Sequence, residues 1–89
     1  MPFVAFTPNL RRHVEVDRCE VEADTLREAL EAVFEQQPRL RSYLLDDRGA
    51  VRKHIAIVIN GDAIADRETL SDLLTARDEV FIMQALSGG

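Results

Sequence analysis

The chain has 89 residues, of which 46% are hydrophobic and 30% charged, a composition that fits one folded domain and excludes a disordered chain. Sixteen acidic residues against eleven basic ones give a formal net charge of −5, so we expect no nucleic-acid partner. The single cysteine, Cys19, excludes an internal disulfide and offers no zinc cluster. No apolar run approaches the roughly 20 residues that span a membrane, and no signal peptide is evident, so we expect a cytoplasmic protein with no membrane partner.

The first part of the chain predicts two strands and one helix. Residues 2–7 are short, apolar and rich in β-formers, which favours a strand. Apolar residues alternate within 14–23, where a slip of phase predicts a loop or bulge before a second strand. Thr25-Leu26-Arg27-Glu28 matches the capping box that begins a helix, and Pro38 ends this helix by residue 37. One apolar face follows, comprising Leu26, Ala29, Leu30, Val33 and Phe34.

The second part predicts a short helical turn and three further strands. Residues 39–45 form the turn, and 54–59 are a dense run of β-branched residues typical of a strand. Asn60-Gly61 is the dipeptide favoured in two-residue hairpins, so 62–64 should return as a short strand. The last strand is expected at 80–83. The side chains predicted to point inward from the turn and from the polar connection 66–76 are Leu40, Tyr43, Leu44, Leu70, Leu73 and Leu74.

This order of elements predicts an α+β fold of the β-grasp type. We expect a mixed sheet of four to five strands packed on one main helix, with the last strand in the middle beside the first. The C-terminal tail would then extend from a central strand. We divide the chain into a β-grasp domain at 1–85 and a flexible diglycine tail at 86–89.

The sequence finishes with Leu86-Ser87-Gly88-Gly89, and two glycines at that place are rare by chance. Without a Cβ, Gly88 and Gly89 can enter a slot one backbone wide. A terminal carboxyl group has a pKa of about 3.5, so at neutral pH it is an anion that resists nucleophiles until it is activated. We therefore treat the carboxylate of Gly89 as the candidate reacting group, with Leu86, Ser87 and Gly88 as the segment that enters a partner.

The sequence resembles the MoaD/ThiS family of ubiquitin-like sulfur carriers over nearly its whole length. The resemblance rests on 23–30 (ADTLREAL), on 57–61 (IVING), and on the run from Asp78-Glu79-Val80 to the diglycine. The Leu10-Arg11-Arg12-His13 stretch and the longer middle segment look closest to carriers of the CysO type.

The resemblance implies a protein cosubstrate rather than an enzyme, or a small non-catalytic subunit of a sulfur-transferring synthase. A MoeB/ThiF-type adenylyltransferase would join the carboxylate of Gly89 to AMP, and sulfur would then displace AMP to leave a thiocarboxylate. A sulfur donor enzyme and a sulfur-accepting synthase are the other partners implied. We expect no cofactor or metal on this chain, because it has no phosphate-cradling loop and no metal cluster, so ATP and magnesium belong to the partner.

A partner must also hold the folded body, because ordering four tail residues costs about 4–8 kcal/mol. Burying one large apolar side chain returns about 1.5–3 kcal/mol, so two or three anchors are needed. If the helix covers one face, alternation puts Val80 and Ile82 inward on the last strand, and Phe3 and Ala5 inward on the first. The side chains left on the other face are Phe6, Phe81 and Met83, and the alternative is that one or more of these three fill the core. The predicted docking patch comprises Phe6, Phe81 and Met83.

The other reactive side chains point to no second site. His13 and His54 are far apart in the sequence, and we interpret both as surface or structural residues. Cys19 is interpreted as a small hydrophobic residue.

Three functions stay open: a sulfur carrier, a modifier joined to lysines through Gly89, and a β-grasp binding module with an incidental diglycine. The receiving pathway also stays open between cysteine, thiamin, molybdopterin, tRNA and a secondary metabolite, as do the oligomeric state and any processing beyond Gly89.

Overall fold

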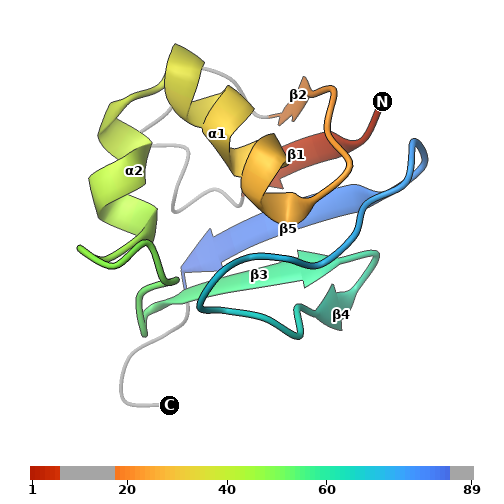
Figure 1. Cartoon of the computed structure of the whole chain (residues 1–89). Helices are drawn as coiled ribbons and strands as arrows, with labels where there is room; N and C mark the ends of the chain where they lie inside the picture. The colour runs from red at the N-terminus through yellow and green to blue at the C-terminus, as the bar shows by residue number, and fades with distance from the viewer. Residues whose placement is uncertain (7–17, 85–89) are drawn as a thin grey trace.

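The computed structural model describes residues 1–6 and 18–84. Figure 1 shows two helices lying together on one side of a sheet. The strands are β1 (Phe3–Phe6), β2 (Arg18–Glu20), β3 (Ile55–Ile59), β4 (Asp62–Ala63) and β5 (Glu79–Gln84), and the helices are α1 (Leu26–Gln36) and α2 (Arg39–Leu44). Part of the predicted second-strand region, 14–17, and the predicted tail, 86–89, lie outside the described residues.

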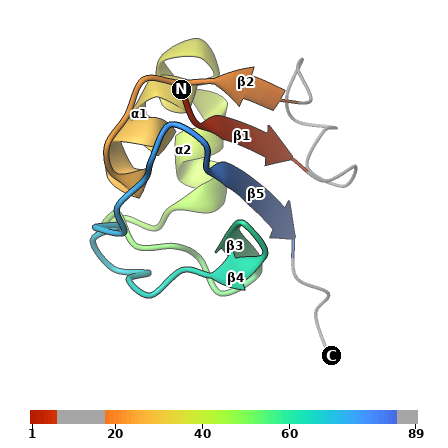
Figure 2. The same cartoon turned by 90° about the vertical axis from the view of Figure 1, so that its right-hand side faces the viewer.

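The strands form one five-stranded sheet in the order β2-β1-β5-β3-β4, which Figure 2 shows from top to bottom. β1 and β5 are parallel neighbours in the middle, and the other pairs are antiparallel. This is the predicted mixed sheet with the last strand beside the first. The expected β-grasp fold is therefore confirmed.

Helix α1 begins where the sequence predicts, because its first turn is closed by a reciprocal cap. The backbone N–H of Glu28 donates to Oγ1 of Thr25 at 3.2 Å, and the N–H of Thr25 donates to Oε1 of Glu28 at 3.2 Å. Two helix donors that would otherwise lack partners are thereby satisfied. The helix ends at Gln36, one residue before its C-cap Gln37 and two before Pro38.

The core lies between the helices and the sheet. The apolar face predicted for α1 is buried, and α2 adds Leu40 and Leu44. From the sheet, Val80 and Ile82 are fully buried, as the alternation predicts. Tyr43 of α2 is only half-buried.

The hairpin between β3 and β4 uses the predicted dipeptide, with φ of 53° at Asn60 and 90° at Gly61. Both angles lie in the left-handed region that this type of tight turn requires. The side chain of Asn60 also reaches the start of β5: its Nδ2 donates to Oδ1 of Asp78 at 2.8 Å, and its Oδ1 accepts from the N–H of Glu79 at 3.0 Å. The turn therefore holds the beginning of the central strand.

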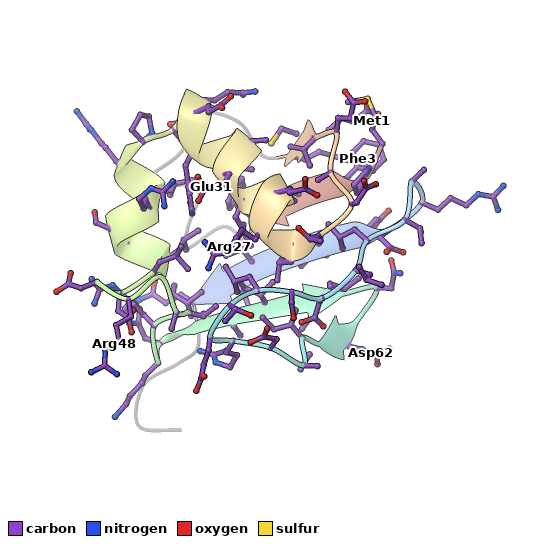
Figure 3. All side chains as sticks on the ribbon, viewed as in Figure 1. Met1, Phe3, Arg27, Glu31, Arg48 and Asp62 are labelled. Atoms are coloured by element: carbon purple, nitrogen blue, oxygen red, sulfur yellow. The ribbon has the colours of Figure 1, made fainter. Side chains whose placement is uncertain are left out.

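The connection between β4 and β5 packs against the start of α1. The N–H of Leu26 donates to the carbonyl of Asp72 at 2.9 Å, and the N–H of Arg27 donates to the carbonyl of Leu70 at 3.0 Å. The Arg27 side chain turns toward this connection (Figure 3), where its Nε donates to the carbonyl of Thr69 at 2.9 Å. The two backbone bonds satisfy N–H groups of the first turn that have no partner within the helix.

The prediction that three leucines anchor this connection is correct for Leu70 and Leu74 and wrong for Leu73, which is 79% exposed. The backbone of Leu73 forms a bridge with Thr25 at the edge of α1, and this bridge lies between the two buried leucines. The backbone of residue 73 is thus held at the helix while its side chain points to solvent.

A single carboxylate organises the first half of this connection. Asp66 accepts from the N–H of Thr69 at 2.9 Å, from Oγ of Ser71 at 2.6 Å and from Oγ1 of Thr69. The hydroxyls of Ser71 and Thr69, followed by the N–H of Thr69, hold the pKa of Asp66 well below its usual range. The ionised form of Asp66 therefore stabilises the folded chain.

We expect Asp66→Asn to lower the urea midpoint at pH 7. Because the folded-state pKa of Asp66 is lowered, its contribution is present above the ordinary pKa of about 3.9 and is lost as the pH falls through the folded value. The midpoints of the two proteins should therefore converge in acid. The measurement is urea unfolding followed by circular dichroism from pH 7 down to pH 2.

The matched control is Asp62→Asn, because Asp62 is exposed on β4 (Figure 3) and no hydrogen bond joins its side chain to a described residue. A gap between wild type and Asp66→Asn that stays constant down to pH 2 would contradict the assignment.

Candidate functional site

Strand β5 brings the chain to the predicted site, although Leu86, Ser87, Gly88 and Gly89 themselves lie outside the described residues. Gln84 is the last described residue, and it pairs with Ile55 of β3. Its Oε1 accepts a hydrogen bond from the Tyr43 hydroxyl of α2 at 3.2 Å. The carboxyl end of the central strand is therefore bonded both to a neighbouring strand and to a helix.

The face of the sheet opposite the helices is unusually apolar around this strand. Phe81 lies opposite Ala5 of β1 and Val58 of β3, and Met83 lies opposite Ala56. Paired residues on neighbouring strands share a face, so these side chains form one surface. A sheet face without covering helices is ordinarily polar, which makes this surface a candidate for contact with another protein. We call it the outer apolar face, defined as Ala5, Ala56, Val58, Phe81 and Met83.

Beside Phe81 the surface is hollowed between β1, β2 and β5. The hollow has a volume of about 200 Å³ and is lined in part by Phe3, Arg18 and Glu79. The guanidinium carbon of Arg18 lies 3.9 Å from the centre of the Phe3 ring, within the range of a cation–π interaction. A charged rim therefore borders the apolar surface on this side.

The structure places two of the three predicted docking residues on this face. Phe81 is 38% exposed and Met83 is half-buried, and both alternate with the buried Val80 and Ile82. Their role in docking stays a prediction.

The inclusion of Phe6 in an outward patch is wrong, because Phe6 is only 5% exposed. The phase expected for the whole first strand is inverted: Val4 and Phe6 are buried, whereas Phe3 and Ala5 lie on the other face and are half-buried. The physical reason is the register with β5, which pairs Phe6 with the inward Ile82. All four residues of β1 are apolar, so its sequence alone carries no alternation from which to find the buried face.

The other candidate residues form no second site in the described part of the chain. The ring of His54 contacts Tyr43 edge-on, with 5.8 Å between ring centroids, and His13 lies outside the described residues. Cys19 is half-buried on β2, where desolvation raises the pKa of its thiol and disfavours the reactive thiolate. Within residues 1–6 and 18–84, no three His, Cys, Asp or Glu side chains gather as metal ligands, and no helix is long and apolar enough to cross a membrane.

The sheet is mixed, its central strands β1 and β5 are parallel, and it packs on one main helix. In the sequence, β5 is followed by Gly88-Gly89. These features together define the class of small ubiquitin-like proteins. Within that class, the model of the ThiS family matches residues 6–89, and the chain belongs to this family. The predicted membership of the MoaD/ThiS family is confirmed.

Known proteins agree with this assignment. The chain is 34% identical over 73 residues to the small archaeal modifier protein 1 of Haloferax volcanii, covering 81% of this chain and 79% of that protein. A crystal structure of the same modifier superposes with a TM-score of 0.79 at 28% identity, over 99% of this chain and 98% of the other. Mycobacterium tuberculosis CysO gives a TM-score of 0.84 at 19% identity, over 97% and 100% of the two chains, and shows the shared fold. The chain is thus a ubiquitin-like protein of the sulfur-carrier and modifier class.

We expect Phe6→Ala to lower the free energy of unfolding by about 3–5 kcal/mol, because it empties a buried site. Phe81→Ala should lower it by about 1 kcal/mol or less, because the ring lies at the surface. The two substitutions remove the same atoms from opposite faces of the sheet, so each is the control for the other. Urea unfolding at equilibrium measures both losses. Equal losses would contradict the placement of the two rings.

Proposed function

We propose that the chain is a protein cosubstrate whose Gly89 carboxylate is adenylated by a MoeB/ThiF-type adenylyltransferase and converted to a thiocarboxylate. The observation that carries this proposal is the family match, which runs to residue 89 and includes the diglycine. The fold supports it, because the central strand β5 ends only five residues before Gly89. The role of the chain is to present a reacting group, and the catalytic groups belong to its partners.

The chemistry needs two displacements. A carboxylate oxygen of Gly89 attacks the α-phosphorus of ATP, and pyrophosphate leaves with the oxygen that bridged the α- and β-phosphorus atoms. The acyl adenylate no longer carries the negative charge that protects a carboxylate, so hydrosulfide attacks the acyl carbon and AMP departs. A persulfide reaches the same product when a thiol then reduces the acyl disulfide. ATP and magnesium are held by the partner in this scheme.

The outer apolar face supplies the anchoring surface that such a partner needs. The last residues of the chain lose conformational freedom when they enter a narrow slot, which costs about 1–2 kcal/mol for each residue. Phe81 and Met83 lie on β5, the strand that leads into these residues, and their apolar neighbours come from β1 and β3. Burial of this surface against a partner would offset the cost of ordering the tail. A crystal structure of the Amycolatopsis orientalis BexX/CysO complex contains a protein of the same fold at 19% identity, which supports a mode of action through a partner protein.

The second candidate function is a protein modifier, and the 34% identity to a protein named small archaeal modifier protein 1 favours it. Both functions share the adenylation of Gly89 and differ in the next nucleophile. Sulfide gives a thiocarboxylate, whereas a lysine amine gives an isopeptide bond. In the third candidate, a β-grasp binding module, Gly89 has no reaction at all.

We expect incubation with ATP, magnesium, the adenylyltransferase and sulfide to change the mass of the chain by the exchange of one oxygen for sulfur. A variant with one alanine added after Gly89 should show no exchange, because its terminal carboxylate no longer belongs to the diglycine. Intact-protein mass spectrometry measures both. Adducts on lysines of other proteins, without sulfur exchange, would instead establish the modifier. If deletion of Gly89 leaves the function of the chain in the cell unchanged, the β-grasp binding module is supported instead.

We expect Phe81→Arg to raise the KM of the adenylyltransferase for this chain by about tenfold or more, because it places a charge in the surface that the partner must bury. The control is Glu35→Arg, an exposed position on the opposite side of the sheet. Steady-state release of pyrophosphate measures KM, and urea unfolding checks that both variants are folded. Equal KM values for the two variants would exclude the outer apolar face from docking.

A further inference from the structure

A second surface, rich in arginine, lies on the helix side of the molecule. A hollow of about 400 Å³ opens between the end of α2 and the turn at 46–49. Three arginines line it, accompanied by two aspartates and one serine, in a protein whose net charge is −5. The charged and polar residues of this arginine hollow are Arg41, Arg48, Arg52, Asp46, Asp47 and Ser42.

One of the aspartates is already used by the fold. Oδ1 of Asp46 accepts from the N–H of Arg48 at 2.8 Å and from the N–H of Ala50 at 3.0 Å. The N–H groups of Ala50 and Arg48, with the nearby Arg52 and Arg48 guanidinium groups, hold the pKa of Asp46 below its usual range. This carboxylate closes the turn on which Arg48 stands.

The arginines retain donors for a ligand. Arg52 uses Nε to donate to the carbonyl of Ser42 at 2.8 Å, a contact that orients its terminal nitrogens. Arg41 pairs with Glu31 of α1, and its side chain is still 52% exposed. No hydrogen bond or ion pair joins the Arg48 side chain to any residue in the described ranges, and Figure 3 shows it extending away from the ribbon. A planar guanidinium with free donors is suited to a carboxylate, which it binds through two parallel hydrogen bonds.

The place of the hollow in the fold indicates what approaches it. Ser42 is adjacent in the chain to Tyr43, whose hydroxyl donates to Gln84 at the end of β5. Figure 1 shows the end of α2 and the head of β5 at the same end of the molecule. A partner that receives the residues after Gln84 therefore faces this end and comes within reach of the hollow.

We infer that the arginine hollow receives an acidic segment of the adenylyltransferase, whose aspartate or glutamate side chains pair with Arg48 and its neighbours. The inference rests on the proposed function, because it names the partner that takes Gly89. Complementary charge at this position speeds encounter and orients the two proteins, and it opposes the repulsion that an acidic partner would otherwise feel from this acidic chain.

The test compares two charge reversals that change the net charge equally. Arg48→Glu alters the hollow, whereas Arg77→Glu alters an exposed residue in the turn before β5, at the other end of that strand. At low salt we expect Arg48→Glu to raise the KM of the adenylyltransferase about tenfold with kcat unchanged, and Arg77→Glu to change KM by less than about twofold. The difference should shrink as the salt rises, because the screening length falls from about 30 Å at 0.01 M to about 3 Å at 1 M.

The outcomes separate this inference from the proposed function. A wild-type chain that the adenylyltransferase does not activate overturns both. A wild-type chain that is activated, with equal KM values for Arg48→Glu and Arg77→Glu at low salt, overturns the arginine hollow alone. Recovery of the low KM when an acidic residue of the partner is replaced by arginine, in the presence of Arg48→Glu, establishes the pairing directly.

Discussion

The parallel pairing of β1 with β5 is the constraint on which the rest of the structure depends. It joins the first and last described strands in the middle of the sheet, with Val4 opposite Val80 and both side chains fully buried. This register determines which residues of β1 enter the core and which lie on the outer apolar face. It also places the carboxyl end of β5 beside α2, where the Tyr43 hydroxyl meets Gln84. One backbone ladder therefore sets the outer apolar face and brings the end of β5 beside α2, the helix whose end borders the arginine hollow.

Several features that sequence reasoning predicted correctly are encoded by neighbouring residues. The capping box of α1 lies within four positions, and Asn60-Gly61 is a complete turn signal by itself. The sequence predicts Val80 and Ile82 inward on the condition that the helix covers that face, with Phe81 and Met83 outward, and the structure has this phase. In these cases the local preference and the tertiary fold agree, which is the general property of sequences that fold to one structure.

The errors share the opposite origin, because they concern contacts between distant segments. The face of β1 is decided by its pairing with β5, and four apolar residues in a row contain no signal of that choice. The backbone of Leu73 is bridged to Thr25, far away in the sequence, and its side chain is exposed to solvent. The arginine hollow was missed for a similar reason: its members come from the end of α2, the following turn and the approach to β3, and no spacing rule links them. The proposed reacting group, the carboxylate of Gly89, rests on the sequence and the family resemblance alone, since it lies outside the described residues.

The central position of β5 has a consequence for biosynthesis. Of the described strands, β1 leaves the ribosome first and its neighbour β5 leaves last, after all the other helices and strands of the sheet and its helical layer. Contacts of such long range form late, because most of the chain must be ordered to close the loop between them. A chain interrupted before Glu79 lacks the strand that joins β1 to β3, so it exposes unpaired edges and is open to proteolysis. The sheet is therefore complete only once β5 has been translated, and the architecture itself discriminates against products that lack this strand.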